Sequence, residues 1–143
     1  MKESPEENYK IKFEIQQIQK EIEIIEILKN VLMNGELDEI QLRAAGSTLH
    51  SIYNGIEKIL LLKIKEQKIE IELNNKWHTE LLIKAVENKI ISKKIEEELR
   101  EIMGFRHFFR HAYGFMINKN NIEPLIKKMK YVFEDFSNEI NKK

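Results

Sequence analysis

The stretch IKFEIQQIQKEIEIIEILKNVL, residues 11–32, places an aliphatic side chain at every third or fourth position. The series consists of Ile11, Ile15, Ile18, Ile22, Ile25, Leu28 and Leu32. Because an α-helix turns once in about 3.6 residues, this spacing gathers the series on one face. The stretch therefore predicts a long amphipathic helix. We expect it to end at Asn34-Gly35, where a glycine can adopt the left-handed conformation of a helix cap.

The same spacing recurs along the chain and predicts four more helices. Their expected ranges are residues 38–64, 77–87, 92–117 and 122–140. Ser92 is suited to cap the fourth helix, and Pro124 falls in the first turn of the fifth, where its missing N–H costs little. We expect no β-strands. The predicted fold class is all-α, an up-and-down bundle of four or five helices in one domain, residues 1–143.

Several polar residues of the second and third helices suggest structural roles. The small residues at positions 44–47 would let another helix approach closely. We expect His50 and His78 to be partly buried imidazoles with one hydrogen bond each. Tyr53 and Glu57 lie one turn apart, and we expect them to form a pair on the surface.

Composition limits the class of protein and its compartment. A chain of 143 residues can bury a core without disulfides, and this chain contains no cysteine. Its charged first ten residues lack the apolar segment of a secretory signal. The longest apolar run, residues 59–62, is far too short to cross a bilayer. We therefore expect a cytoplasmic protein that has no membrane partner.

Charge is balanced over the whole chain but not along it. Basic and acidic residues both number 24, which argues against a protein that coats polyanions without selectivity. Residues 1–40 hold ten acidic residues against five lysines, whereas residues 100–119 hold four basic residues against one acidic residue. A ligand that carries phosphate would prefer the second region.

Residues 106–113, RHFFRHAY, bring two arginines, two histidines and a tyrosine into eight positions. On a helical wheel Arg106, Arg110 and Tyr113 fall on one side, within about 60° of each other. His107 and His111 follow at about 100° and 140° from Arg106. The opposite arc is apolar and consists of Phe105, Phe108, Phe109, Ala112, Phe115 and Met116. We expect this arc to pack on the core and the polar side to carry the function.

The apolar residues that precede Gly104 lie on a different side of the same wheel. Ile95, Leu99 and Ile102 fall within about 40° of Arg106. Two arrangements account for this change. Either the helix bends at Gly104, or the side that carries Arg106 faces another helix, which a second subunit can supply.

Histidine and arginine together suit chemistry on a phosphodiester. A histidine titrates near neutral pH and can accept or donate a proton, and the guanidinium fork matches phosphate oxygens. RNA supplies its own nucleophile, the 2′-hydroxyl, so its cleavage needs only a base, a cation and the right geometry. His107 and His111 are four residues apart and could grip a metal ion, but no acidic ligand lies near them in the sequence. We therefore expect no metal site and no cofactor.

Arg106, His111 and Tyr113 form the pattern R-x4-H-x-Y, which resembles the motif of HEPN-domain ribonuclease toxins of the HepT type. Two further stretches look like the second and third helices of that family: LHSIYNGIEKI, residues 49–59, and WHTELL, residues 77–82. The motif also falls late in the chain, on the penultimate helix. The resemblance thus covers most of the sequence.

The resemblance implies a metal-independent endoribonuclease, the toxin of a toxin–antitoxin pair, that works as a homodimer. The arginine and histidine of both subunits meet in a cleft, where the 2′-hydroxyl of RNA attacks the adjacent phosphate. Carried onto this chain, Arg106 would position the phosphate and His111 would be the general acid–base. His107 matches the polar position after the arginine. We infer from the wheel that Arg110 is a second phosphate contact.

The resemblance also implies a partner, a nucleotidyltransferase antitoxin of the MNT type. This partner would attach AMP to Tyr113, and the added phosphates would block the positive cleft. The wheel itself favours a site shared between subunits, because Arg106 and His111 lie about 140° apart on one helix.

Two other functions are compatible with the sequence. The first is a non-catalytic HEPN module, whose cationic cleft binds a nucleotide or assists a neighbouring nucleotidyltransferase. The second is a helical interaction module, in which the side that carries Arg106 and Tyr113 is a protein interface.

Overall fold

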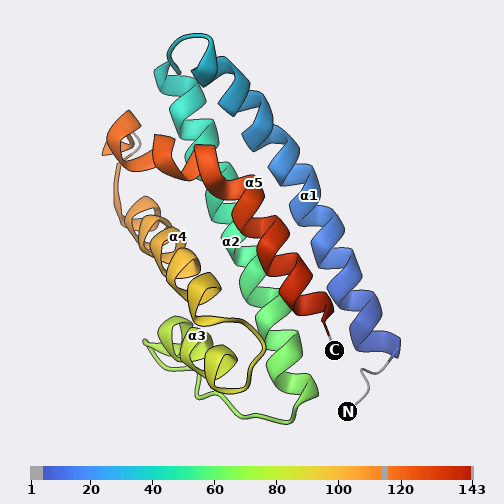
Figure 1. The fold of residues 1–143 in the computed structure, drawn as a ribbon. Helices are drawn as coiled ribbons and strands as arrows, with labels where there is room; N and C mark the ends of the chain where they lie inside the picture. Colours follow the sequence, from blue (N-terminus) through green and yellow to red (C-terminus); the bar gives the residue numbers. More distant parts are fainter. Residues whose placement is uncertain (1–4, 114–115, 143) are drawn as a thin grey trace.

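The computed structural model describes residues 5–113 and 116–142, and within them the chain forms five α-helices and no strand (Figure 1). The helices are α1 (Pro5–Met33), α2 (Glu39–Glu66), α3 (Trp77–Glu87), α4 (Lys93–His111) and α5 (Lys119–Asn141). This confirms the predicted all-α bundle. Within the described residues, no helix is long and apolar enough to span a membrane.

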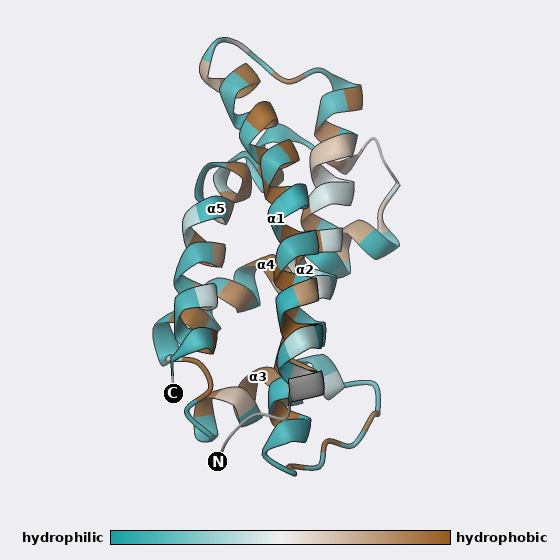
Figure 2. Ribbon diagram, turned by 90° about the vertical axis from the view of Figure 1, so that its right-hand side faces the viewer, coloured by the Kyte–Doolittle hydropathy of each residue, from teal (hydrophilic) through white to brown (hydrophobic). Residues whose placement is uncertain are grey.

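Helix α2 is the central element of the bundle. It runs antiparallel to α1, while α5 lies in front and α4 and the short α3 cover the remaining side (Figure 1). All four other helices contact α2. One apolar cluster draws residues from all five helices, and Ile25, Ile56 and Phe136 in it are fully buried. Figure 2 shows hydrophilic residues spread over the outward sides of the helices, as the amphipathic patterns predict.

Three helices begin at polar capping residues. Asp38 accepts a hydrogen bond from the backbone N–H of Gln41, and the Gln41 side chain accepts one from the backbone of Asp38. Asn118 and Asn121 form the same reciprocal pair before α5. Ser92 caps α4, as predicted. These caps satisfy N–H groups that the first helical turn leaves without partners.

Two predictions about helix ends are wrong. Gly35 does not adopt the left-handed conformation. Instead, the side-chain amide of Asn34 bonds a backbone carbonyl of the last turn of α1. Helix α5 begins directly after Asn118, so Pro124 is its sixth residue and lies beyond the first turn. Because the capping pair at Asn118 starts the helix three residues earlier than predicted, Pro124 lies inside it. Its missing N–H therefore leaves one internal hydrogen bond of the helix unmade.

Helix α4 is continuous through Gly104, and the side that carries Arg106 faces α2 of the same chain. Of the two arrangements that the wheel allowed, a bend at Gly104 is therefore excluded, and the neighbouring helix is α2. Ile95, Leu99 and Ile102 are buried on that side. Because they fill the contact with α2, the helix needs no bend to bury its apolar residues.

The prediction that the phenylalanine arc packs on the core is only partly right. Phe105 is buried and Phe109 is partly buried against the core. Phe108 and Met116, however, are 36% and 41% exposed. The face of α4 that packs on the core includes Phe105 and Phe109, whereas Phe108 lies at its edge and is partly exposed. Phe115 lies outside the described residues.

Helix α4 ends at His111, six residues before the predicted end at Ile117. Ile117 is buried, and its side chain lies beside Gly46 on α2. The chain must leave the axis of α4 to bring Ile117 back to α2. Tyr113 therefore follows the helix and does not belong to it.

Two glycines allow α2 to approach its neighbours closely. A Cβ atom on Gly55 would lie 2.6 Å from Cγ1 of Ile18 on α1. A Cβ atom on Gly46 would lie 2.9 Å from the ring of Phe109 on α4. The small residues at positions 44–47 were predicted to permit such an approach, and Gly46 does so.

The contact at Gly55 predicts that Gly55→Ala destabilises the protein, although alanine is the better helix former. The new methyl group would force Ile18 out of place, which typically costs about 1–3 kcal/mol. Gly104→Ala is the matched control, because a Cβ atom there meets nothing within 4 Å. That change should stabilise by about 0.5–1 kcal/mol. Urea unfolding measures both, and a Gly55→Ala protein as stable as the Gly104→Ala protein contradicts the close approach.

Candidate functional site

Arg106 reaches from α4 to the central helix. It is half-buried, and its Nε donates a hydrogen bond to Oδ1 of Asn54 on α2, with an N···O distance of 2.7 Å. None of the described residues bonds the two terminal nitrogens of Arg106. Asn54 therefore fixes the orientation of the guanidinium and leaves the fork of terminal N–H groups for a ligand.

A second cation and an imidazole lie beside Arg106. Arg110 is exposed one turn further along α4, and none of the described carboxylates pairs with either arginine. Burial and then the charges of Arg106 and Arg110 lower the pKa of His50 on α2. The ring of Phe109 lies against His50, with 5.5 Å between ring centroids. The site thus combines two arginines with an imidazole that favours its neutral form.

His107 and His111 lie on another side of α4. Both are exposed, and their ring centroids are 4.7 Å apart. In the part of the chain that the structure describes, no group of three histidine, aspartate or glutamate side chains gathers where it could hold a metal ion. Arg106 bonds α2 and His111 is exposed, and no hydrogen bond among the described residues joins the two.

Tyr113 follows the end of α4 and is 71% exposed. The wheel had placed it beside Arg106 on the same helix. Tyr113 is not on that helix, because Ala112 already has an extended backbone. Tyr113 is nevertheless accessible to a modifying enzyme, whereas Tyr53 on α2 is fully buried.

The predicted surface pair of Tyr53 and Glu57 is wrong, because both are buried. Oε2 of Glu57 lies 2.5 Å from Nδ1 of His78 on α3. His78 thus has the one hydrogen bond that was expected. Burial and the charge of Glu57 raise the pKa of Tyr53 far above its usual range. Glu57 and His78 thus tie α3 to α2, whereas Tyr53 lies within range of the charge of Arg106.

His50 and Asn54 are the site residues that the sequence did not reveal. His50 was predicted to be structural, with one hydrogen bond, yet no described residue bonds its Nδ1. A signal was present: His50, Asn54 and Lys58 repeat every four residues, so they form a polar stripe along a helix that is otherwise apolar. On a central helix, the polar groups of such a stripe need hydrogen-bonding partners from neighbouring helices, as Asn54 has in Arg106.

The fold is an all-α bundle, and the arginine pair lies on its penultimate helix. Both features are those expected of a HEPN-domain protein from the R-x4-H-x-Y motif. The family model of HepT-like proteins matches residues 44–142. The chain therefore belongs to this family, a HepT-type branch of the HEPN proteins, and the resemblance is confirmed. The matched stretch contains the whole arginine site and leaves out α1. No curated protein and no solved structure matches the chain significantly.

The site predicts that the pKa of His50 lies below 6.5, its ordinary value. Arg106→Gln should raise this pKa part of the way back, because one repelling charge is removed while burial remains. Lys94→Gln, which removes a charge from the first turn of α4, is the control and should leave it unchanged. Titration of the imidazole by NMR measures each pKa. A value at or above 6.5 in the parent protein contradicts the proximity of the arginines.

The same shift links stability to pH. Because the unfolded chain protonates His50 at a higher pH than the folded protein does, the free energy of unfolding decreases as the pH falls below 6.5. His50→Gln should make that decrease less steep. Urea unfolding at a series of pH values between 5 and 8 measures how the free energy of unfolding depends on pH. The same dependence in the parent and in His50→Gln would contradict a contribution from His50.

Proposed function

We propose that this protein is the toxin of a HEPN/MNT toxin–antitoxin pair and cleaves RNA without a metal ion. Membership of the HepT-like family supports this proposal. The observation that carries it is the pair of arginines without carboxylate partners among the described residues, one of them held by Asn54. Two neighbouring cations without carboxylate partners, in a protein whose net charge is zero, suit a phosphodiester more than a neutral ligand.

The chemistry follows from the residue types. The 2′-hydroxyl of RNA loses its proton to a base and attacks the adjacent phosphate, which forms the 2′-O–P bond. The bond from phosphorus to the 5′-oxygen breaks, and that oxygen takes up a proton. His111 serves as general acid–base, and Arg106 stabilises the charge on the phosphate. Arg110 and His107 contact the substrate beside them, and the products carry 2′,3′-cyclic phosphate and 5′-hydroxyl ends.

A homodimer completes the site in this proposal. Within one protomer Arg106 turns toward α2, whereas His111 is exposed. A two-fold axis close to α4 would bring His111 of the partner subunit to the arginine pair, because such an axis presents the same surface from both subunits. Each dimer would then contain two equivalent cleavage sites.

Regulation in this proposal acts on Tyr113. An MNT-type nucleotidyltransferase attaches AMP to the hydroxyl of this tyrosine, whose side chain is largely exposed. The phosphate of AMP carries negative charge, so it would occupy the arginine pair in place of RNA. Tyr9 and Tyr131 are also exposed but lie on α1 and α5. Their modification would leave the arginines accessible.

His111→Ala is expected to lower RNA cleavage by about a hundredfold or more, because a general acid–base contributes at least that much. Cleavage by the parent protein should persist in EDTA and leave cyclic phosphate ends. Gel assays with labelled RNA measure cleavage, and circular dichroism checks the fold. Undiminished cleavage by a folded His111→Ala protein contradicts the proposal. A parent protein that binds nucleotides but cleaves no RNA would instead favour the non-catalytic module.

Co-expression with the nucleotidyltransferase is expected to increase the intact mass of the protein by one or more AMP units. Tyr113→Phe should abolish the increase. Tyr131→Phe, which removes a hydroxyl from another exposed tyrosine, is the control and should retain it. Mass spectrometry decides, and a mass increase that survives Tyr113→Phe would place the modification elsewhere.

A further inference from the structure

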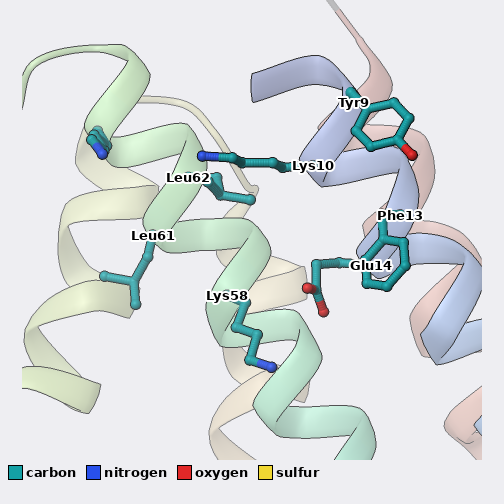
Figure 3. A pocket seen from close by; sticks show the side chains of 8 residues that line it. Tyr9, Lys10, Phe13, Glu14, Lys58, Leu61 and Leu62 are labelled. Carbon is teal, nitrogen blue, oxygen red and sulfur yellow. The ribbon is translucent and has the colours of Figure 1, made fainter. Parts of the chain in front are cut away.

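A groove of about 590 Å³ lies between the N-terminal turns of α1 and the C-terminal turns of α2 (Figure 3). Tyr9 and Phe13 line it from α1, and Leu62 lines it from α2. Figure 3 shows the two rings one after the other along α1. Tyr9 is 72% exposed and Phe13 is 48% exposed. Because aromatic rings normally bury most of their surface, two exposed rings one turn apart form a ready surface for stacking.

The groove continues toward the arginine site. A second hollow between α1 and α2 shares Phe13 and Lys58 with the groove and extends along α2 to Asn54. Asn54 is the residue that holds Arg106. From Asn54 to Lys65, at the far end of the groove, α2 rises about 16 Å. A strand that leaves Arg106 along α2 would therefore enter the groove within one or two helical turns.

The charged residues that line the groove from α2 are both lysines, whereas those from α1 are one lysine and one glutamate. Lys58 and Lys65 are exposed on α2, and none of the described carboxylates forms an ion pair with either of them. On α1, Lys10 and Glu14 line the groove, and Glu14 and Glu21 line the second hollow. Phosphates would therefore follow α2, and bases would turn toward α1. There the rings offer stacking surfaces and the carboxylates accept hydrogen bonds from exocyclic amino groups.

We propose that this groove binds single-stranded RNA next to the cleaved phosphate. Its bases stack on Tyr9 and Phe13, and its backbone lies along Lys58 and Lys65. The rise of about 16 Å from Asn54 to Lys65, over both hollows, accommodates about five stacked nucleotides at 3.4 Å each. The lysines and the continuity with Arg106 favour RNA over an apolar segment of a protein. This inference rests on the proposed ribonuclease function and assigns it a substrate-binding surface outside the motif.

The test measures binding separately from cleavage. A fluorescein-labelled single-stranded RNA of 12 nucleotides with mixed sequence is titrated with the His111→Ala protein, and its anisotropy is recorded. Phe13→Ser in that background should weaken binding about tenfold, as the loss of one stacked base does. Lys58→Gln with Lys65→Gln should lower the slope of log K against log salt by about 1.4, which corresponds to two phosphate contacts. Lys94→Gln with Lys127→Gln is the charge-matched control and should change neither value.

Cleavage supplies the second measurement. In the protein with intact His111, the groove variants should raise the KM for the 12-nucleotide RNA and leave cleavage of a dinucleotide unchanged, because a dinucleotide is too short to fill the groove. Groove variants that bind the longer RNA as tightly as the parent overturn the inference and leave the ribonuclease proposal standing. An altered oligomeric state with unchanged RNA affinity in Phe13→Ser also overturns it, because the groove is then a protein interface. A parent protein that binds no RNA overturns both proposals.

Discussion

The central place of α2, which packs against every other helix, is the constraint on which the structure depends. The other four helices all contact it, and Gly46 and Gly55 provide the space that α4 and α1 require. A central helix that is apolar all round would need no further interactions. This one carries the half-buried Asn54 and the buried Glu57, and a polar group removed from water is costly unless it has a partner. Each therefore recruits a side chain from a neighbouring helix, and Arg106 is the partner of Asn54.

That requirement explains the geometry of the arginine site. Held by Asn54, Arg106 keeps its terminal nitrogens available, and Arg110 stands beside it without a carboxylate partner in the described residues. Burial, and then the two charges, lower the pKa of His50. The same bond turns Arg106 toward α2, whereas His111 is exposed on α4. One hydrogen bond thus orders the cation and directs it to α2, and the proposed second subunit would supply the histidine that acts with it.

Periodicity predicted the five helices because burial of one face leaves a regular trace in the sequence. Their ends were predicted only where a local side chain decides them, as Ser92 does for α4. The end of α4 depends on the distant contact of Ile117 with α2, which no local pattern records. Burial of Glu57 was missed for the same reason: its partner, His78, lies 21 residues away on another helix. The motif residues were visible in the sequence, whereas the role of Asn54 depends on packing between helices.

The central claim is that Arg106 of one subunit acts with His111 of the partner subunit. The most direct measurement mixes two variants, Arg106→Ala and His111→Ala, under conditions that exchange subunits. Random exchange makes about half of the dimers mixed, and each mixed dimer contains one complete pair out of two. RNA cleavage should therefore return to about a quarter of the parent activity. Cleavage that stays at the level of the separate variants, while mass spectrometry shows mixed dimers, contradicts the account.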